Sequence, residues 1–160
     1  MDKLQPGQTG ESLPPGEWVL RLAIASKDFL ETGQVSPEVF AFSTEDRADD
    51  PPRLSVWAEE LTRPEQAWRL MGGKPNYRLA LRLNVDAIRA LRPNPDSPEV
   101  PNLDVQWHTL LQEDGSPDTR PGAGGHAGIT RLDAGSSAQR KSWRRRLAGL
   151  ASQHLRFITF

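Results

Sequence analysis

The sequence has no cysteine, and this absence excludes several kinds of site and fold. Without thiols the chain forms neither disulfide bonds nor thiolate-ligated zinc sites, so it is not a small disulfide-stabilised secreted module. It also lacks a run of about 18 apolar residues, the length that a membrane-spanning helix needs. Residues 1–16 are polar and contain Pro and Gly instead of the apolar core of a signal peptide. We therefore expect a cytoplasmic protein with no membrane partner.

The chain also has no large excess of positive or negative charge. The net charge of −1 argues against a protein that coats nucleic acid. The charges are nevertheless unevenly distributed along the chain. Acidic residues predominate in 38–60, whereas 138–160 contains basic residues and no acidic one. This division predicts opposite local potentials on one small protein.

Apolar residues are scarce, at 36%, and 14 Pro and 13 Gly indicate long loops. Five Trp and five Phe still indicate a folded core, because disordered chains contain few aromatic residues. A length of 160 residues suits one domain. The sequence thus predicts a flexible tail over residues 1–16 and a single domain over residues 17–160.

Alternating apolar residues predict the strands. The clearest segments are Glu17–Ala25, Leu54–Ala58 and Tyr77–Leu83, where apolar side chains recur at every second position. Shorter strands are expected at 104–110, 126–132 and 155–160, and a short strand or extended piece at 39–42.

Three helices are predicted from capping residues and from spacing. Thr62 followed by Glu65 resembles a capping box, Asn84 or Asp86 begins a short helix, and Ser136 or Ser137 begins the last one. In that last helix one face carries the apolar residues Trp143, Leu147, Leu150 and Ala151.

The order of these elements predicts the fold class. Strands do not alternate regularly with long helices, so a doubly wound parallel sheet is not expected. We predict an α+β fold. It has a mixed or antiparallel sheet of about 5–7 strands, two or three helices, and a C-terminal amphipathic helix packed on the sheet.

Short sequence pieces give one resemblance. They are Asp28-Phe29-Leu30, Val35-Ser36-x-x-Val39-Phe40, Asp46, Leu54-Ser55-Val56-Trp57, Thr62-x-x-Glu65-Gln66-Ala67, His126-Ala127-Gly128-Ile129 and Leu147-Ala148. Together they resemble a group of small uncharacterised bacterial proteins with a Leu-Ser-Val … His-Ala-x-Ile pattern, over roughly residues 17–152. The resemblance implies a compact bacterial protein of one domain and implies no activity. The long 113–125 loop departs from that pattern.

His126, Ser55 and Asp46 are the candidate catalytic residues. His126 follows two glycines at the start of a strand, and an imidazole suits proton transfer near neutral pH. Asp46, with Ser43 and Thr44 nearby in sequence, would complete a Ser/His/Asp set, although no nucleophile-elbow motif surrounds Ser55. Two structural alternatives remain: His126 fixes the loop by bonding a backbone carbonyl, and Asp46 caps a turn.

Arg140, Lys141, Arg144 and Arg145 are the candidate binding residues of the last helix. They form two pairs at a spacing of four, and guanidinium groups bind carboxylate or phosphate. The alternative is a solvated outer face. The three His residues are widely separated, so no metal site is expected, and the glycines at 122–125 lead into a strand, so no phosphate loop or cofactor is expected.

Three functions remain open. The first is a non-enzymatic interaction or regulatory accessory module with a protein partner, encoded in a bacterial operon. The second is a group-transfer enzyme, for which Arg21 as a binding residue, Ser55 and Tyr77 suggest the order of an ADP-ribosyltransferase-like fold. The third is a nucleic-acid-binding protein that uses the arginine-rich helix.

Overall fold

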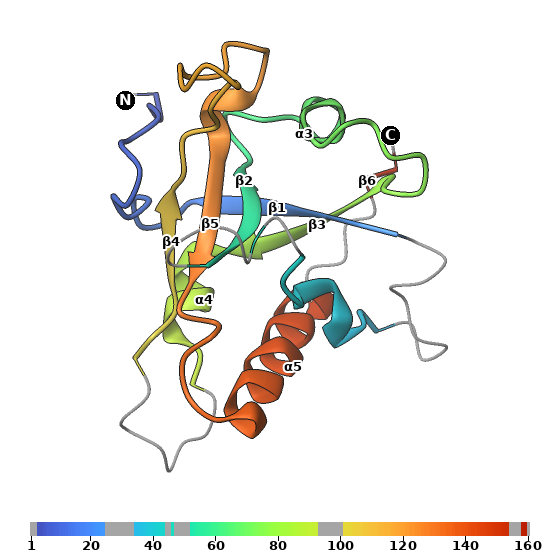
Figure 1. Ribbon diagram of the computed structural model, residues 1–160. Coiled ribbons are helices and arrows are strands. Elements are labelled where there is room, and N and C mark those ends of the chain that lie inside the picture. Colours follow the sequence, from blue (N-terminus) through green and yellow to red (C-terminus); the bar gives the residue numbers. More distant parts are fainter. Residues whose placement is uncertain are drawn as a thin grey trace.

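The computed structural model describes residues 3–24, 34–43, 46, 52–92, 101–153 and 158–159, and these residues form one six-stranded sheet (Figure 1). The order across the sheet is β4-β5-β2-β1-β3-β6. The strands are β1 (Trp18–Ala23), β2 (Arg53–Ala58), β3 (Leu79–Asn84), β4 (Asp104–Trp107), β5 (His126–Thr130) and β6 (Ile158–Thr159). All neighbouring pairs are antiparallel, which confirms the predicted α+β class and its antiparallel alternative.

Helices cover both faces of the sheet. The described residues contain α3 (Pro64–Leu70), α4 (Val85–Ala90) and α5 (Ser137–Gln153), together with the 3₁₀ helices η1 (Pro37–Phe40) and η2 (Ala123–Gly125). Helix α5 packs on one face, and α3 lies on the other side (Figure 1). The predicted C-terminal helix on the sheet is therefore confirmed. No helix in the described ranges has both the length and the apolarity needed to cross a membrane.

The alternation of the strands produces two apolar layers. Val19 and Ala23 of β1 point into the main core, where Trp143 and Leu147 of α5 are fully buried. The intervening residues of β1, such as Leu20, point to the opposite face. Because helices cover both faces, both sets of side chains in β1 are withdrawn from water.

The N-terminal segment differs from the expected tail. Residues 10–13 run along β4, where Leu13 N donates to Val105 O at 2.9 Å and Gly10 N donates to Trp107 O at 3.0 Å. Leu13 is 2% exposed and belongs to the main core. The prediction of a flexible tail over residues 1–16 is wrong for this part, because the segment satisfies the open edge of β4 with backbone hydrogen bonds.

Several local predictions also need correction. The strand expected at 39–42 is replaced by η1, which Ser36 caps by accepting from Glu38 N. Helix α3 begins after Arg63, whose N–H donates to the Gln66 side chain at 2.9 Å; Thr62 lies outside the helix. Asn84 caps α4 as predicted, by accepting from Ala87 N.

Candidate functional site

A cavity of about 430 Å³ lies on the face of the sheet that carries α3. Its floor contains Ser55 and Trp57 of β2 and His126 of β5. These side chains share one face because Trp57 pairs with His126 and Ser55 pairs with Gly128. The three catalytic candidates Ser55, His126 and Asp46 all line this cavity.

Ser55 and His126 are in direct contact at the floor. Ser55 Oγ lies 2.7 Å from His126 Nε2. The other ring nitrogen, Nδ1, lies 2.8 Å from the carbonyl oxygen of His108. A carbonyl only accepts, so Nδ1 carries the proton and donates it there. This hydrogen-bond pattern assigns Nε2 as the unprotonated nitrogen, which accepts the Ser55 hydroxyl proton.

Burial keeps His126 neutral. His126 is 7% exposed, and burial lowers the pKa of its imidazole to about 4. The hydrogen bond to His108 O opposes this shift, while the nearby His108 and Arg53 charges add to it. At neutral pH the ring is therefore an uncharged hydrogen-bond acceptor toward Ser55.

A close backbone contact fixes the position of His126. A Cβ atom on Gly125, the preceding residue, would lie 2.0 Å from Thr62 Oγ1, so only glycine fits there. Thr62 also donates from Oγ1 to Gly122 O at 2.6 Å, which ties the turn before β5 to the start of α3. Thr62, predicted as a helix cap, instead anchors the loop that leads to the candidate site.

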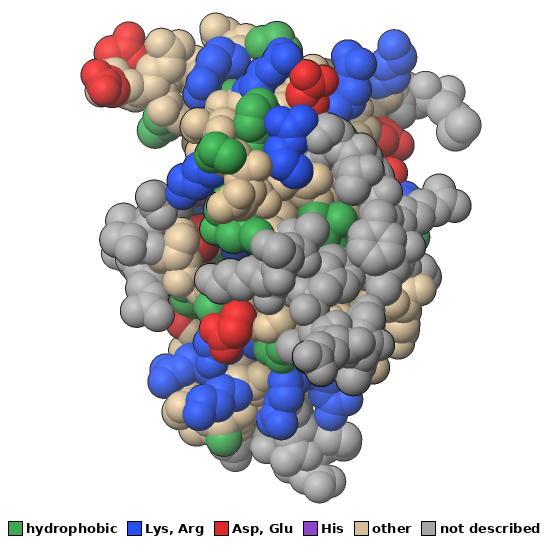
Figure 2. Space-filling model, turned by 90° about the vertical axis from the view of Figure 1, so that its right-hand side faces the viewer, with side chains coloured by type: hydrophobic (Ala, Val, Ile, Leu, Met, Phe, Trp, Pro, Cys, Tyr) green, Lys and Arg blue, Asp and Glu red, His purple; other side chains and the backbone are tan. Residues whose placement is uncertain are grey.

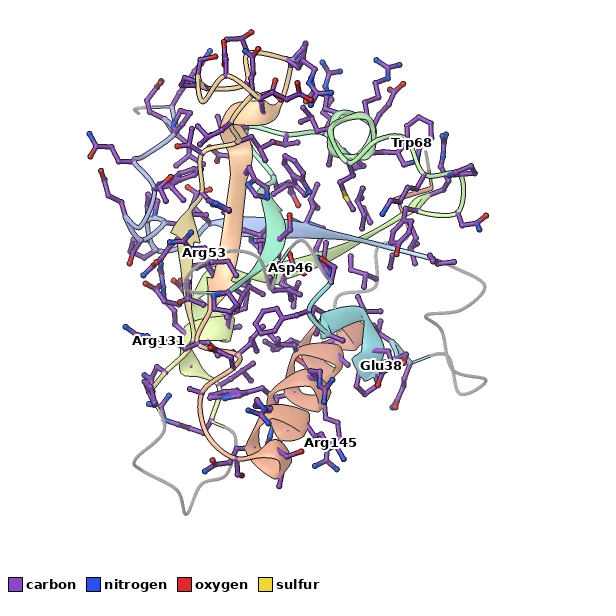
Figure 3. All side chains as sticks on the ribbon, in the orientation of Figure 1. Glu38, Asp46, Arg53, Trp68, Arg131 and Arg145 are labelled. Carbon is purple, nitrogen blue, oxygen red and sulfur yellow. The ribbon has the colours of Figure 1, made fainter. Side chains whose placement is uncertain are left out.

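Asp46 is buried but does not orient His126. Ser43 N donates to the Asp46 carboxylate at 2.9 Å, and Asp46 N donates to Ser43 Oγ at 3.1 Å. Figure 3 shows Asp46 beside the crossing of β1 and β2. The expected Ser/His/Asp set therefore shares a cavity without forming one hydrogen-bonded chain, and the turn-capping alternative describes Asp46. Thr44 lies outside the described residues.

Arg21 connects three elements beside the cavity. Strands β1 and β2 pair at Val19–Ala58 and Leu20–Trp57 and then diverge, as their steep crossing in Figure 1 shows. Arg21 Nη1 donates to Ser55 O at 2.7 Å, and Nε and Nη2 donate to Val39 O at 3.1 and 3.0 Å. The guanidinium thus satisfies carbonyls where the strands separate, and it places a positive charge next to Ser55.

The walls of the cavity are largely apolar. Leu70 and Met71 at the end of α3 form one wall, and Leu110 contributes from the loop after β4. Lys74 and Tyr77 line the cavity where the chain approaches β3, and the lysine Nζ lies 5.8 Å from the centre of the tyrosine ring. A small molecule with an apolar part and a reactive polar centre would match this lining.

Sequence reasoning missed Trp57 and His108. Trp57 was identifiable, since it follows Ser55 by two positions on one strand and therefore shares its face. His108 was not, because its carbonyl reaches His126 only through the pairing of β4 with β5. Within the described part of the chain, no group of three or more His, Asp or Glu side chains is arranged to hold a metal ion.

The basic residues of α5 lie far from Ser55 and point in different directions. Arg140 and Arg144 line a separate groove near Phe40, on the α5 side of the sheet. Lys141 and Arg145 are exposed, and Figure 3 shows Arg145 on the outer side of the helix. Lys and Arg side chains gather over α3 and over α5 in the view of Figure 2.

Comparison of the chain with protein-family models, with curated proteins and with solved structures finds no match. The resemblance to a group of small bacterial proteins therefore stays a prediction.

Proposed function

We propose that the chain is a small group-transfer enzyme that uses Ser55 as its nucleophile and His126 as the proton acceptor. The observation that carries this proposal is the 2.7 Å contact between Ser55 Oγ and His126 Nε2 at the floor of a cavity large enough for a small substrate. A serine hydroxyl held against an unprotonated imidazole nitrogen is the arrangement that activates serine for attack.

The chemistry is that of acyl transfer. As Ser55 Oγ attacks the carbonyl carbon of an ester, its proton passes to His126 Nε2. The bond to the leaving oxygen then breaks, and the imidazolium returns the proton to that oxygen. In the second half, water attacks the acyl-serine and gives a proton to Nε2. The bond from the acyl carbon to Ser55 Oγ then breaks, and the imidazolium returns the proton to Oγ, which releases the acid and restores both residues.

The positive charge of Arg21 and the low basicity of His126 restrict this chemistry. The guanidinium, bonded to Ser55 O, would favour the negative charge that develops beside the serine. An imidazole whose pKa lies near 4 is fully available at neutral pH but is a weak base. We therefore expect activated substrates with good leaving groups, such as aryl esters, rather than amides.

Covalent labelling with a small fluorophosphonate tests the proposal. Ser55 Oγ would attack phosphorus with loss of fluoride, giving one stable adduct that mass spectrometry of peptides locates on Ser55. The Ser55→Ala variant should lose the adduct, and His126→Gln should slow labelling on the order of a hundredfold. The exposed Ser116→Ala variant is the matched control and should label at the wild-type rate.

Two results would contradict a nucleophilic Ser55: no adduct on the wild-type protein, or equal labelling of Ser55→Ala.

The alternative in which the transferred group comes from NAD is tested by a separate measurement. Calorimetry with NAD should give no heat of binding, because the Arg21 guanidinium donates to Val39 O and Ser55 O. A saturable NAD signal would favour the ADP-ribosyltransferase-like alternative.

The docking and nucleic-acid roles predicted from α5 concern other residues. They depend on Arg140, Lys141, Arg144 and Arg145, none of which lines the cavity. A phosphate-driven role predicts binding that weakens steeply as salt rises.

A further inference from the structure

A second hollow of about 430 Å³ lies on the α5 side of the sheet. Arg140 and Arg144, one helical turn apart, form one wall. Phe40 at the end of η1, Phe42 just after it and Leu132 after β5 contribute the apolar lining, and of these three Phe42 is the part-exposed one. The hollow thus places two guanidinium groups beside aromatic surface, and we call it the arginine groove.

Among the described residues, the guanidinium groups of this groove have no carboxylate partner, unlike those of four other arginines. These four arginines each form an ion pair with a carboxylate: Arg69, Arg82, Arg89 and Arg120. Neither the Arg140 nor the Arg144 side chain makes a hydrogen bond or ion pair with any residue in the described ranges. Arg144 is nevertheless half-buried. A partly desolvated guanidinium without a carboxylate gains more from an incoming anion than a fully solvated one does.

The lining favours one kind of occupant. Each guanidinium can bind a carboxylate through two parallel hydrogen bonds, and the part-exposed Phe42 can accept an apolar side chain. An acidic peptide segment that also carries an apolar side chain offers both. Nucleic acid fits less well, because it presents a long row of phosphates to a chain whose net charge is −1. Asp133 also lines the groove and repels carboxylates and phosphates alike, so it does not distinguish the two occupants.

We infer that the arginine groove docks an acidic segment of a protein partner, with carboxylates on Arg140 and Arg144 and an apolar side chain against Phe42. The groove and the Ser55 cavity lie on opposite faces of the sheet. Docking therefore leaves the cavity open, and this inference does not depend on the proposed enzymatic function.

Selection from a library of short random peptides tests the inference. The wild-type protein should enrich peptides that combine Asp or Glu with an aromatic or aliphatic residue. The Arg140→Gln/Arg144→Gln double variant should not enrich them. The matched control is Arg145→Gln/Arg146→Gln, which removes the same charge from exposed positions of the same helix outside the groove. Thermal melts of all three proteins check that the variants are folded.

Fluorescence anisotropy with an enriched peptide then distinguishes binding in the arginine groove from non-specific electrostatic attraction to the basic helix. Binding should weaken about tenfold or more in the groove variant, change less than about threefold in the control, and fall as salt rises. Peptides without acidic residues, equal losses in both variants, or no enrichment at all would overturn the inference. So would tighter binding of duplex DNA, which would assign the basic surface to nucleic acid instead.

Discussion

A single absent methyl group at Gly125 determines where His126 can lie. The Cβ atom of an alanine there would come within 2.0 Å of Thr62 Oγ1 and 3.1 Å of Leu61 Cβ. Thr62 cannot yield easily, since it is buried and bonded to Gly122 O. The loop before β5 and the start of α3 would have to separate, and His126 would move with the loop.

Replacing this glycine is therefore expected to be costly. Gly125→Ala should lower the free energy of unfolding by about 1–3 kcal/mol, as overpacking does elsewhere. Gly149→Ala is the control, because nothing lies within 4 Å of its added Cβ and it sits inside α5. That change should raise stability by about 0.5–1 kcal/mol. Urea denaturation measures both, and a neutral Gly125→Ala would contradict the close contact.

The residue types of the candidate site could be predicted from the sequence, but their connections could not. Ser55 and His126 were recognisable as a hydroxyl and an imidazole near one strand edge. That Nδ1 of His126 bonds the carbonyl of His108, and not the carboxylate of Asp46, follows from strand register and loop path. Strand register and loop path depend on the tertiary fold and cannot be read from the spacing of residues in the sequence.

At the scale of elements, the N-terminal segment is the largest departure from expectation. Its Gly, Pro and Ser residues have no apolar period, so nothing in the sequence pattern indicates that it pairs with β4. The pairing uses backbone groups, and only Leu13 contributes a large buried side chain. Ser12 and Arg89 both donate to Asp104, at 2.6 and 2.8 Å, and hold the segment against β4 and α4.

This segment should contribute to stability as part of the fold. Leu13→Ala should cost about 2–5 kcal/mol, because it removes a side chain that is 2% exposed from the main core. Gln5→Ala, at an exposed position of the same segment, should change stability by no more than about 0.5 kcal/mol. Equal, negligible effects in chemical denaturation would mean that the segment is a tail after all.

Elements with a strong period were predicted well. The stripe of Trp143, Leu147 and Ala151 identified α5, and the alternation in β1, β2 and β3 identified the centre of the sheet. The strand prediction for residues 39–42 was wrong because four residues are too few to distinguish a strand from a 3₁₀ turn. The last strand was expected over 155–160; only Ile158–Thr159 of it falls within the described residues.

At the scale of the whole molecule, the neutral state of His126 links the candidate site to stability. Its pKa is about 4 when folded and about 6.5 when unfolded, so the unfolded chain binds more protons between these values. Stability should therefore fall as pH drops through this window, by at most roughly 3 kcal/mol, and should not change further below it from this cause. In His126→Gln this part of the pH dependence should disappear.

The proposed role of Ser55 requires that His126 is neutral and presents an unprotonated Nε2 to the serine hydroxyl. Nuclear magnetic resonance of the protein with ¹⁵N-labelled histidine measures this directly, because the two ring nitrogens resonate differently when protonated and when bare. We predict a proton on Nδ1 and none on Nε2 near neutral pH, with a titration midpoint at about 4. A proton on Nε2, or a midpoint at the ordinary histidine value of about 6.5, would contradict the account.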